Sequence, residues 1–291
     1  MLKSKEVHRF VYGFENKQGV TDKDIVKTIK ILEKRLNNFG VQSEIQPLRN
    51  KHIEIIVKAH KLNVDRLNGI IINPGKLEFW ELYKGDTFLN YFVELYEGVT
   101  DNDSVAGKSL FDLISSRGYL GGPVIFNFKE RDTSYVDSLI QKKRLKVELN
   151  FDGHKVKFLW GKNDSYGDIP LYAAKSNRAN KAPLTGDAII KASHVFGVTG
   201  IPEVSMEMNE EGAMIWGRMT EKAFQNKTNI AIVLNDIVQS APGVTSGGIR
   251  GGRSSISGNF TVEEAQDLAV ILASGGTIQK LVLQEYAVVS N

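Results

Sequence analysis

Few side chains in this sequence combine the residue type and the spacing that metal binding or catalysis requires. A helical zinc site needs two histidines at i and i+4, and no two of the five histidines have that spacing. The histidines are His8, His52, His60, His154 and His194. The chain has no cysteine, which excludes disulfides, thiolate catalysis and cysteine-bound zinc. We therefore predict no metal site and no cofactor.

Serines and carboxylates do not form a catalytic motif either. Ser254, Ser255 and Ser257 lie close to glycines, but the G-x-S-x-G pattern of a nucleophile elbow does not surround them. The pairs Glu210-Glu211 and Glu263-Glu264 stand at the predicted starts of helices, where carboxylates favour the positive end of the helix dipole. We predict that the protein has no catalytic residues and is not an enzyme.

A glycine-rich segment, residues 246–255, has the composition of an anion-binding loop. Its glycines would let backbone N–H groups approach a phosphate, and Arg250 and Arg253 would pair with that anion. The spacing fits neither G-x-x-x-x-G-K-S/T nor G-x-G-x-x-G, and no helix begins directly after the segment. A mobile connection between two strands explains the same composition, and the sequence favours that interpretation.

Four aromatic side chains at i, i+3, i+4 and i+8 fall on one face of a predicted helix. They are Phe88, Tyr91, Phe92 and Tyr96. This face either packs in a core or forms a partly exposed apolar groove. A groove would suit an unfolded polypeptide, because a partner of varied sequence calls for non-directional apolar contact. We treat the four residues as candidates for polypeptide binding.

The bulk composition is that of an ordinary soluble globular protein. The chain has 291 residues, of which 42% are hydrophobic and 24% charged. The net charge is only +3, with acids and bases interleaved, so no nucleic-acid partner is expected. No stretch approaches the ~20 apolar residues of a membrane span, and no signal peptide is expected before Val7. The length allows one large or two smaller domains.

The first 85 residues follow the order β-α-β-β-α-β. Thr21 caps the first helix, with Asp24 three residues on, and Gly40 ends it. The predicted elements are a strand at 7–14, a helix at 22–39, strands at 41–48 and 52–57, a helix at 64–71 and a strand at 76–83.

The last third repeats this order. Asn235-Asp236 provides the turn of a hairpin, and Thr261 with Glu264 forms a capping box before a helix that stops at Gly275-Gly276. The predicted elements are strands at 203–208, 230–234, 237–241, 254–258 and 281–289, and helices at 210–225 and 262–274. This is the split βαβ or ferredoxin-like order.

We predict an α+β fold in which two ferredoxin-like (βαββαβ) halves, residues 1–85 and 183–291, form a base. The stretch between them, 86–182, breaks the pattern and is predicted to be an inserted α+β head domain. Gly85, Asn177 and Pro183 stand in its two short links and are hinge candidates. Because each half leaves edge strands unpaired, we expect the two halves to share one sheet layer.

Many segments, all in one order, resemble the first periplasmic domain of SecD, the accessory subunit of the bacterial Sec translocon. The likeness is greatest to the SecD part of fused SecD–SecF chains. It begins with Leu-Glu-Lys-Arg-Leu-Asn-Asn-Phe-Gly-Val at 32–41 and includes Pro-Glu-Val-Ser-Met-Glu-Met-Asn at 202–209. Further similar segments lie at 75–79, 131–133, 160–161, 181–187, 209–213, 230–235, 240–242 and 257–268. One departure is Gly-Thr-Ile-Gln at 276–279, where relatives usually have a small residue followed by proline.

The resemblance implies the same arrangement of base and inserted head, on the periplasmic side of the bacterial inner membrane. It further implies a domain that binds unfolded, emerging preprotein and assists its proton-motive-force-dependent export. The partners implied are the Sec translocon channel and SecF, through membrane segments that flank such a piece in the family. Two other functions stay open. A solute-sensing or ligand-binding module would need a closed pocket with convergent polar groups, and a ferredoxin-like RNA-binding domain is disfavoured by the modest charge and the missing RNP1 pattern.

Overall fold

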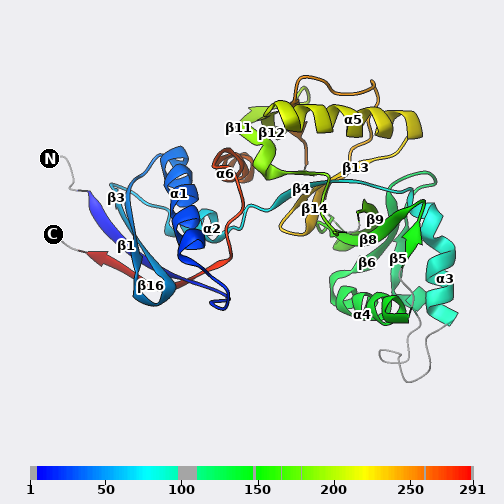
Figure 1. The fold of residues 1–291 in the computed structure, drawn as a ribbon, viewed down its shortest axis with the longest axis horizontal. Coiled ribbons are helices and arrows are strands. Elements are labelled where there is room, and N and C mark those ends of the chain that lie inside the picture. The colour runs from blue at the N-terminus through cyan, green and yellow to red at the C-terminus, as the bar shows by residue number, and fades with distance from the viewer. Residues whose placement is uncertain are drawn as a thin grey trace. The chain divides into compact units, whose positions relative to one another are not determined.

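The computed structural model describes residues 5–97, 110–146, 149–164, 166–177, 179–258 and 260–289. The chain has an α+β fold, as predicted (Figure 1). It divides into two compact units. Unit 1 consists of residues 1–77, 186–211 and 253–291, and unit 2 of residues 78–185 and 212–252. The predicted domains divide the chain differently, at 85/86 and 182/183.

The first sheet of unit 1 has the strand order β16-β1-β3-β2 and is antiparallel throughout. Its strands are β1 (Glu6–Phe14), β2 (Gln42–Leu48), β3 (His52–Ala59) and β16 (Leu281–Val289), and the 3-10 turn η1 (Arg49–Lys51) joins β2 to β3. Two helices, α1 (Asp22–Phe39) and α2 (Val64–Ile72), pack on this sheet. Leu32 and Leu36 of α1 and Leu67 of α2 share one core with Phe10 and Ile55 of the strands.

The fourth strand of this sheet comes from the end of the chain and not from the predicted strand at 76–83. That strand is present as β4 (Leu77–Glu81), but it joins the sheet of unit 2. Its residues 77–80 are all buried, which suits an interior strand with both faces covered. Most side chains of β16 are exposed, which suits an edge strand. Residues 1–85 therefore do not complete a sheet by themselves.

The second sheet of unit 1 has the order β11-β12-β15. These strands are β11 (Ile189–Phe196), which follows the 3-10 turn η5 (Gly186–Ala188), β12 (Pro202–Met208) and β15 (Arg253–Ile256). Helix α6 (Val262–Ala273) packs on β11 and β12. The capping boxes predicted at Thr21 with Asp24 and at Thr261 with Glu264 are both confirmed, and Gly40 ends α1 in the left-handed conformation.

A fully buried arginine holds the helices of unit 1 together. The guanidinium of Arg35 donates hydrogen bonds to the carbonyl oxygens of Ile70, Asn73 and Pro74 at the end of α2, and to Ser274 Oγ at the end of α6. Carbonyls at a helix end lack an intrahelical donor, so the buried cation satisfies them. Burial lowers the pKa of Arg35 to about 10, which still leaves the group charged at neutral pH.

Within the described residues, unit 2 is built on one nine-stranded sheet. Its order is β10-β4-β13-β14-β8-β9-β6-β5, and β7 pairs with β8 beside this path. The further strands are β5 (Ile114–Arg117), β6 (Val124–Lys129), β7 (Asn150–Phe151), β8 (His154–Gly161), β9 (Asp168–Ser176), β10 (Leu184–Thr185), β13 (Ile230–Leu234) and β14 (Ile237–Ser240). The helical segments are η2 (Gly85–Phe88), α3 (Leu89–Glu97), η4 (Leu110–Leu113), α4 (Glu130–Lys146) and α5 (Glu210–Asn226).

The position of the β13–β14 hairpin explains why the two observed units have other boundaries than the predicted domains. The predicted turn is present, with Asn235 and Asp236 in the left-handed conformation. The hairpin adds to the sheet of the middle segment, because β13 lies next to β4 and β14 pairs with β8 in parallel. The strands predicted as a second ferredoxin-like half are thus distributed over three sheets, with β12 and β15 in one, the hairpin in another and β16 in a third.

Candidate functional site

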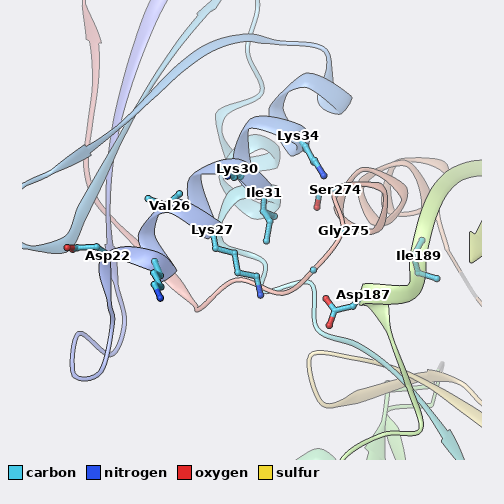
Figure 2. Close-up of a pocket in the computed structure, with 12 residues that line it drawn as sticks. Asp22, Val26, Lys27, Lys30, Ile31, Lys34, Asp187, Ile189, Ser274 and Gly275 are labelled. Atoms are coloured by element: carbon cyan, nitrogen blue, oxygen red, sulfur yellow. The ribbon is translucent and has the colours of Figure 1, made fainter. Parts of the chain in front are cut away.

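A row of lysines follows the exposed face of α1 in unit 1. Lys23, Lys27, Lys30 and Lys34 are spaced 4, 3 and 4 residues apart, which places them along one side of the helix. All four line one cavity of about 720 Å³. Figure 2 shows Lys27 and Lys34 reaching from α1 toward the segment of Ser274 and Gly275. We call this cavity the α1 groove.

The floor of the α1 groove is apolar, and its far wall comes from distant parts of the chain. Ile31 of α1 and Ile189 of β11 are buried side chains that line it. Gly276 adopts a left-handed conformation there (φ 75°), and a Cβ at this position would lie 3.3 Å from Ile31 Cδ1 and 3.5 Å from Asp187 Oδ1. The glycine therefore keeps the floor open at a point where a side chain would narrow it.

The charge of the α1 groove is positive, because its four lysines face only two lining carboxylates, Asp22 and Asp187. Lys27 also acts on a neighbouring carboxylate, because the pKa of Asp24 is lowered chiefly by hydrogen bonds with Thr21 and in addition by the charge of Lys27. Some lysines elsewhere form close ion pairs, as Lys58 with Glu44 at 3.0 Å and Lys280 with Glu15 at 2.7 Å. A row of lysines in excess over the lining carboxylates, above apolar side chains, attracts a partner that carries both acidic and apolar groups.

The side chains that line the α1 groove suit non-covalent binding of a partner. Its hydroxyl, Ser274 Oγ, already donates to the carbonyl of Ile271 and accepts from Arg35 Nε. The described residues contain no group of three or more histidines, cysteines, aspartates or glutamates that could hold a metal ion. The residues that line the groove thus offer electrostatic attraction and apolar contact.

The predicted aromatic candidates lie in the core of unit 2. Phe88 is 2% exposed and Phe92 fully buried, and both rings contact Phe158, at centroid distances of 5.9 and 5.7 Å. Tyr91 is half-buried and packs on the same ring at 5.6 Å. Tyr96 belongs to α3, but its side chain lies outside the described part of the chain. Phe88 and Phe92 are therefore not available to a polypeptide in this conformation, and the alternative of a packed core describes them.

The predicted hinge residues lie inside unit 2 and not at its boundaries. The N–H of Gly85 donates to the carbonyl of Gly122, and a Cβ on Gly85 would lie 2.0 Å from Val124 O. Asn177 Oδ1 accepts from the N–H groups of Ala179 and Lys181, which orders its turn. Pro183 is exposed. Gly85 is thus held by close packing, whereas Asn177 and Pro183 lie in a polar turn.

The glycine-rich segment is anchored to α5. The N–H of Gly248 donates to Glu221 Oε2 at 3.0 Å, and the N–H of Ile249 donates to Thr220 Oγ1 at 2.8 Å. A carboxylate therefore occupies the backbone donor that a phosphate would need, and its charge would repel an anion. The segment serves as a connection between β14 and β15, which was the favoured interpretation of its composition.

The sequence interpretation missed the lysine row. The 4, 3, 4 spacing of the lysines lies on the face of the helix opposite its buried apolar residues, and such spacing alone indicates only a solvated helix face. No sequence signal links α1 to Ile189 or to residues 274–276, because these segments meet only in the folded unit.

Comparison with known proteins shows similarity to SecD over part of the chain. The model of the SecDF P1 head subdomain matches residues 171–277. Protein translocase subunit SecD of Rhodothermus marinus is 44% identical over 106 residues, which is 36% of this chain and 16% of that relative. Protein translocase subunit SecD of Endomicrobium trichonymphae is 43% identical over 175 residues, 55% of this chain and 35% of that relative. The resemblance to the first periplasmic domain of SecD is thereby confirmed.

Solved SecDF structures have the same fold. SecDF in its super-membrane-facing form superposes with a TM-score of 0.57 at 23% identity, covering 99% of this chain and 31% of that one. The structure described as a membrane component SecDF that enhances protein export gives a TM-score of 0.54 at 24% identity, covering 95% of this chain and 98% of that one. These similarities show that the chain has the fold of a SecDF periplasmic domain.

This chain is much shorter than the SecD proteins to which it is similar. The chain spans only 16% and 35% of the two SecD relatives it matches. Among its described residues no helix is long and apolar enough to cross a membrane. The matched head region, 171–277, begins near the end of the predicted head at 86–182 and takes in most of the residues predicted as the second half of the base.

Proposed function

We propose that this SecD-type domain binds emerging, unfolded preprotein on the periplasmic side of the bacterial inner membrane and assists its proton-motive-force-dependent export. The observation that carries the proposal is the similarity to SecD proteins, which are named as protein translocase subunits. In this role the domain is an accessory subunit and not an enzyme. It acts with the Sec translocon channel and with SecF, through membrane segments outside this chain.

The α1 groove supports the proposal. A translocating chain arrives unfolded and varied in sequence, so a receptor for it needs contacts that do not depend on one shape. The lysine row attracts acidic stretches, and the apolar floor at Ile31 and Ile189 accepts side chains that such a segment leaves exposed. Because Phe88 and Phe92 are buried, this groove is a better candidate for first contact than those two residues.

We predict that the charge of the α1 groove controls binding of unfolded polypeptide. Reversing two lysines, K27E/K30E, should weaken binding of fluorescein-labelled, reduced and carboxymethylated α-lactalbumin about tenfold, because each exposed charge contributes a few tenths to about 1 kcal/mol. Fluorescence anisotropy measures the affinity. Raising the salt concentration should also weaken binding by the wild-type domain, because salt screens the attraction between exposed charges.

A matched control separates the groove from net charge. K61E/K181E makes the same change in charge at two exposed lysines that do not line the groove, and it should leave the affinity within about twofold. Equal weakening by both pairs would show a general effect of charge and would remove the groove from the proposal. No binding of the unfolded protein by the wild-type domain at any salt concentration would contradict the proposed function itself.

A further inference from the structure

The outer edge of β11 is an open strand edge of unit 1, and its charged residue, Lys191, lies in the first half of the strand. In the described residues β11 pairs with β12 on one side, and no strand pairs with its other side. An open edge presents backbone N–H and C=O groups that another chain can pair with, and proteins commonly protect it with charges, proline or bulges. The edge strand β2 carries Pro47 and Glu44, and the edge strand β16 carries Glu285.

The last five residues of β11 carry none of these protections. Ala-Ser-His-Val-Phe, residues 192–196, contain neither proline nor a permanently charged side chain. The register irregularity of this strand falls earlier, between Ile189 and Lys191, so residues 192–196 keep a regular ladder with β12. A regular ladder on one side leaves regularly spaced donors and acceptors on the other.

A cavity lies on the face of β11 that α6 covers. His194 pairs with the buried Val204 of β12, and cross-strand partners share one face of a sheet. On this face His194 lines a cavity of about 350 Å³ together with Phe39 of α1 and with Ala269 and Val270 of α6. The remaining lining residues, Asn38, Arg66 and Gln266, are polar. A residue of an added strand opposite His194 would direct its side chain to this face.

One ring nitrogen of His194 lacks a hydrogen-bond partner in the described part of unit 1. Its Nε2 atom is buried and has no hydrogen-bond partner among the described residues. An orphaned buried polar atom beside a cavity leaves a donor or acceptor for an incoming group.

Exposed apolar side chains stand at the end of β11 and in the turn that follows it. Phe196 is 60% exposed and Ile201 48% exposed, and Val198 between them is fully exposed. These three side chains stand at the turn between β11 and β12, where soluble proteins usually place polar residues.

We propose that an extended polypeptide segment adds to the outer edge of β11 as a further strand, with one side chain in the cavity beside His194 and apolar contacts at Phe196. This inference rests on the proposed function and gives the preprotein a second, specific surface. Backbone pairing is independent of the side chains of the bound segment, which is what a receptor for many sequences needs. An extended segment is also the only unfolded conformation that matches the spacing of a strand edge.

N-methylation of a probe peptide tests the pairing. The probe is fluorescein-labelled Lys-Thr-Val-Ser-Phe-Ser-Val-Thr-Lys amide, and its backbone is methylated at every second residue in two complementary series. In an added strand only alternate N–H groups face β11. One series should therefore weaken binding to the full 291-residue chain more than about tenfold, and the other should stay within about twofold. Equal effects of the two series would overturn strand addition.

A surface variant with a matched control locates the edge. F196D should weaken binding of the same probe about fivefold, because it places a charge where the segment leaves the end of β11. Y166D makes the same change at an exposed aromatic residue of unit 2 and should leave binding unchanged. Equal affinities of F196D and wild type would contradict the assignment to β11.

The outcomes separate the inference from the proposed function. Binding of carboxymethylated α-lactalbumin together with a symmetric methylation result would keep the function and remove the β11 edge. Failure to bind either probe would remove both. Concentration-dependent dimers in sedimentation, lost in F196D, would show that a second copy of the chain occupies the edge, which also overturns the proposal.

Discussion

Replacing Arg35 with methionine will lower the free energy of unfolding of unit 1 by about 3 to 5 kcal/mol. Methionine fills much of the volume of the arginine stem but donates no hydrogen bond, so the carbonyl oxygens of Ile70, Asn73 and Pro74 lose a buried donor. Each such loss costs the desolvation of that group. Urea unfolding followed by circular dichroism measures the change as a shift of the midpoint.

Lys34→Met is the control for this variant. The two residues are neighbours on α1, but Lys34 is exposed, so its substitution should change stability by no more than about 0.5 kcal/mol. Arg35→Lys tests geometry, because one ammonium group cannot reach all of the partners of the planar guanidinium. Stability of R35M within 1 kcal/mol of wild type would mean that water or a rearranged Ser274 replaces the lost donors.

The second large effect is expected at Gly85, which was predicted from the sequence to be a hinge. Gly85→Ala should destabilise unit 2 by about 3 kcal/mol, because its Cβ would lie 2.0 Å from Val124 O and 2.4 Å from Val124 C. Val124 cannot move away freely, since it is paired with Tyr172 of β9. Thermal unfolding measures the loss of stability, and near-ultraviolet circular dichroism follows it through the aromatic side chains packed in the core of unit 2.

Gly217→Ala makes the same substitution inside α5, also in unit 2. The nearest atom to its Cβ is Ile249 O at 3.6 Å, an ordinary contact, so alanine should stabilise this helix by about 0.5 to 1 kcal/mol. The two variants should therefore move the unfolding temperature in opposite directions. A G85A protein that unfolds like wild type but supports export poorly would favour the hinge over the packing role.

Local signals in the sequence were sufficient for individual elements. The capping boxes at Thr21 and Thr261, the left-handed Gly40 and the turn at Asn235-Asp236 depend on residues within a few positions of one another, and all are present. Such signals are decided by backbone conformation and short hydrogen bonds, which the sequence specifies directly.

The assignment of strands to sheets could not be obtained in the same way. The pattern of β4 indicated a strand but not its partners, and its burial on both faces became clear only in the sheet of unit 2. Likewise, α3 has an aromatic face whether that face meets solvent or Phe158, and periodicity alone does not distinguish the two. The α1 groove needed Ile189 and Gly276 beside Lys27, and these residues are far apart in sequence.

The pairing of β1 with β16 has a consequence for the order in which the molecule is made. Val7 lies opposite Val289, so β1 must wait for a strand that is synthesised long after it. Contacts at such large sequence separation carry a high loop-closure entropy and form late. Unit 2 contributes 78–185 and 212–252, segments that can associate earlier. During synthesis, one side of β1 thus stays unpaired until residues 281–289 have been made, and a chaperone that recognises exposed strand edges can bind β1 throughout that interval.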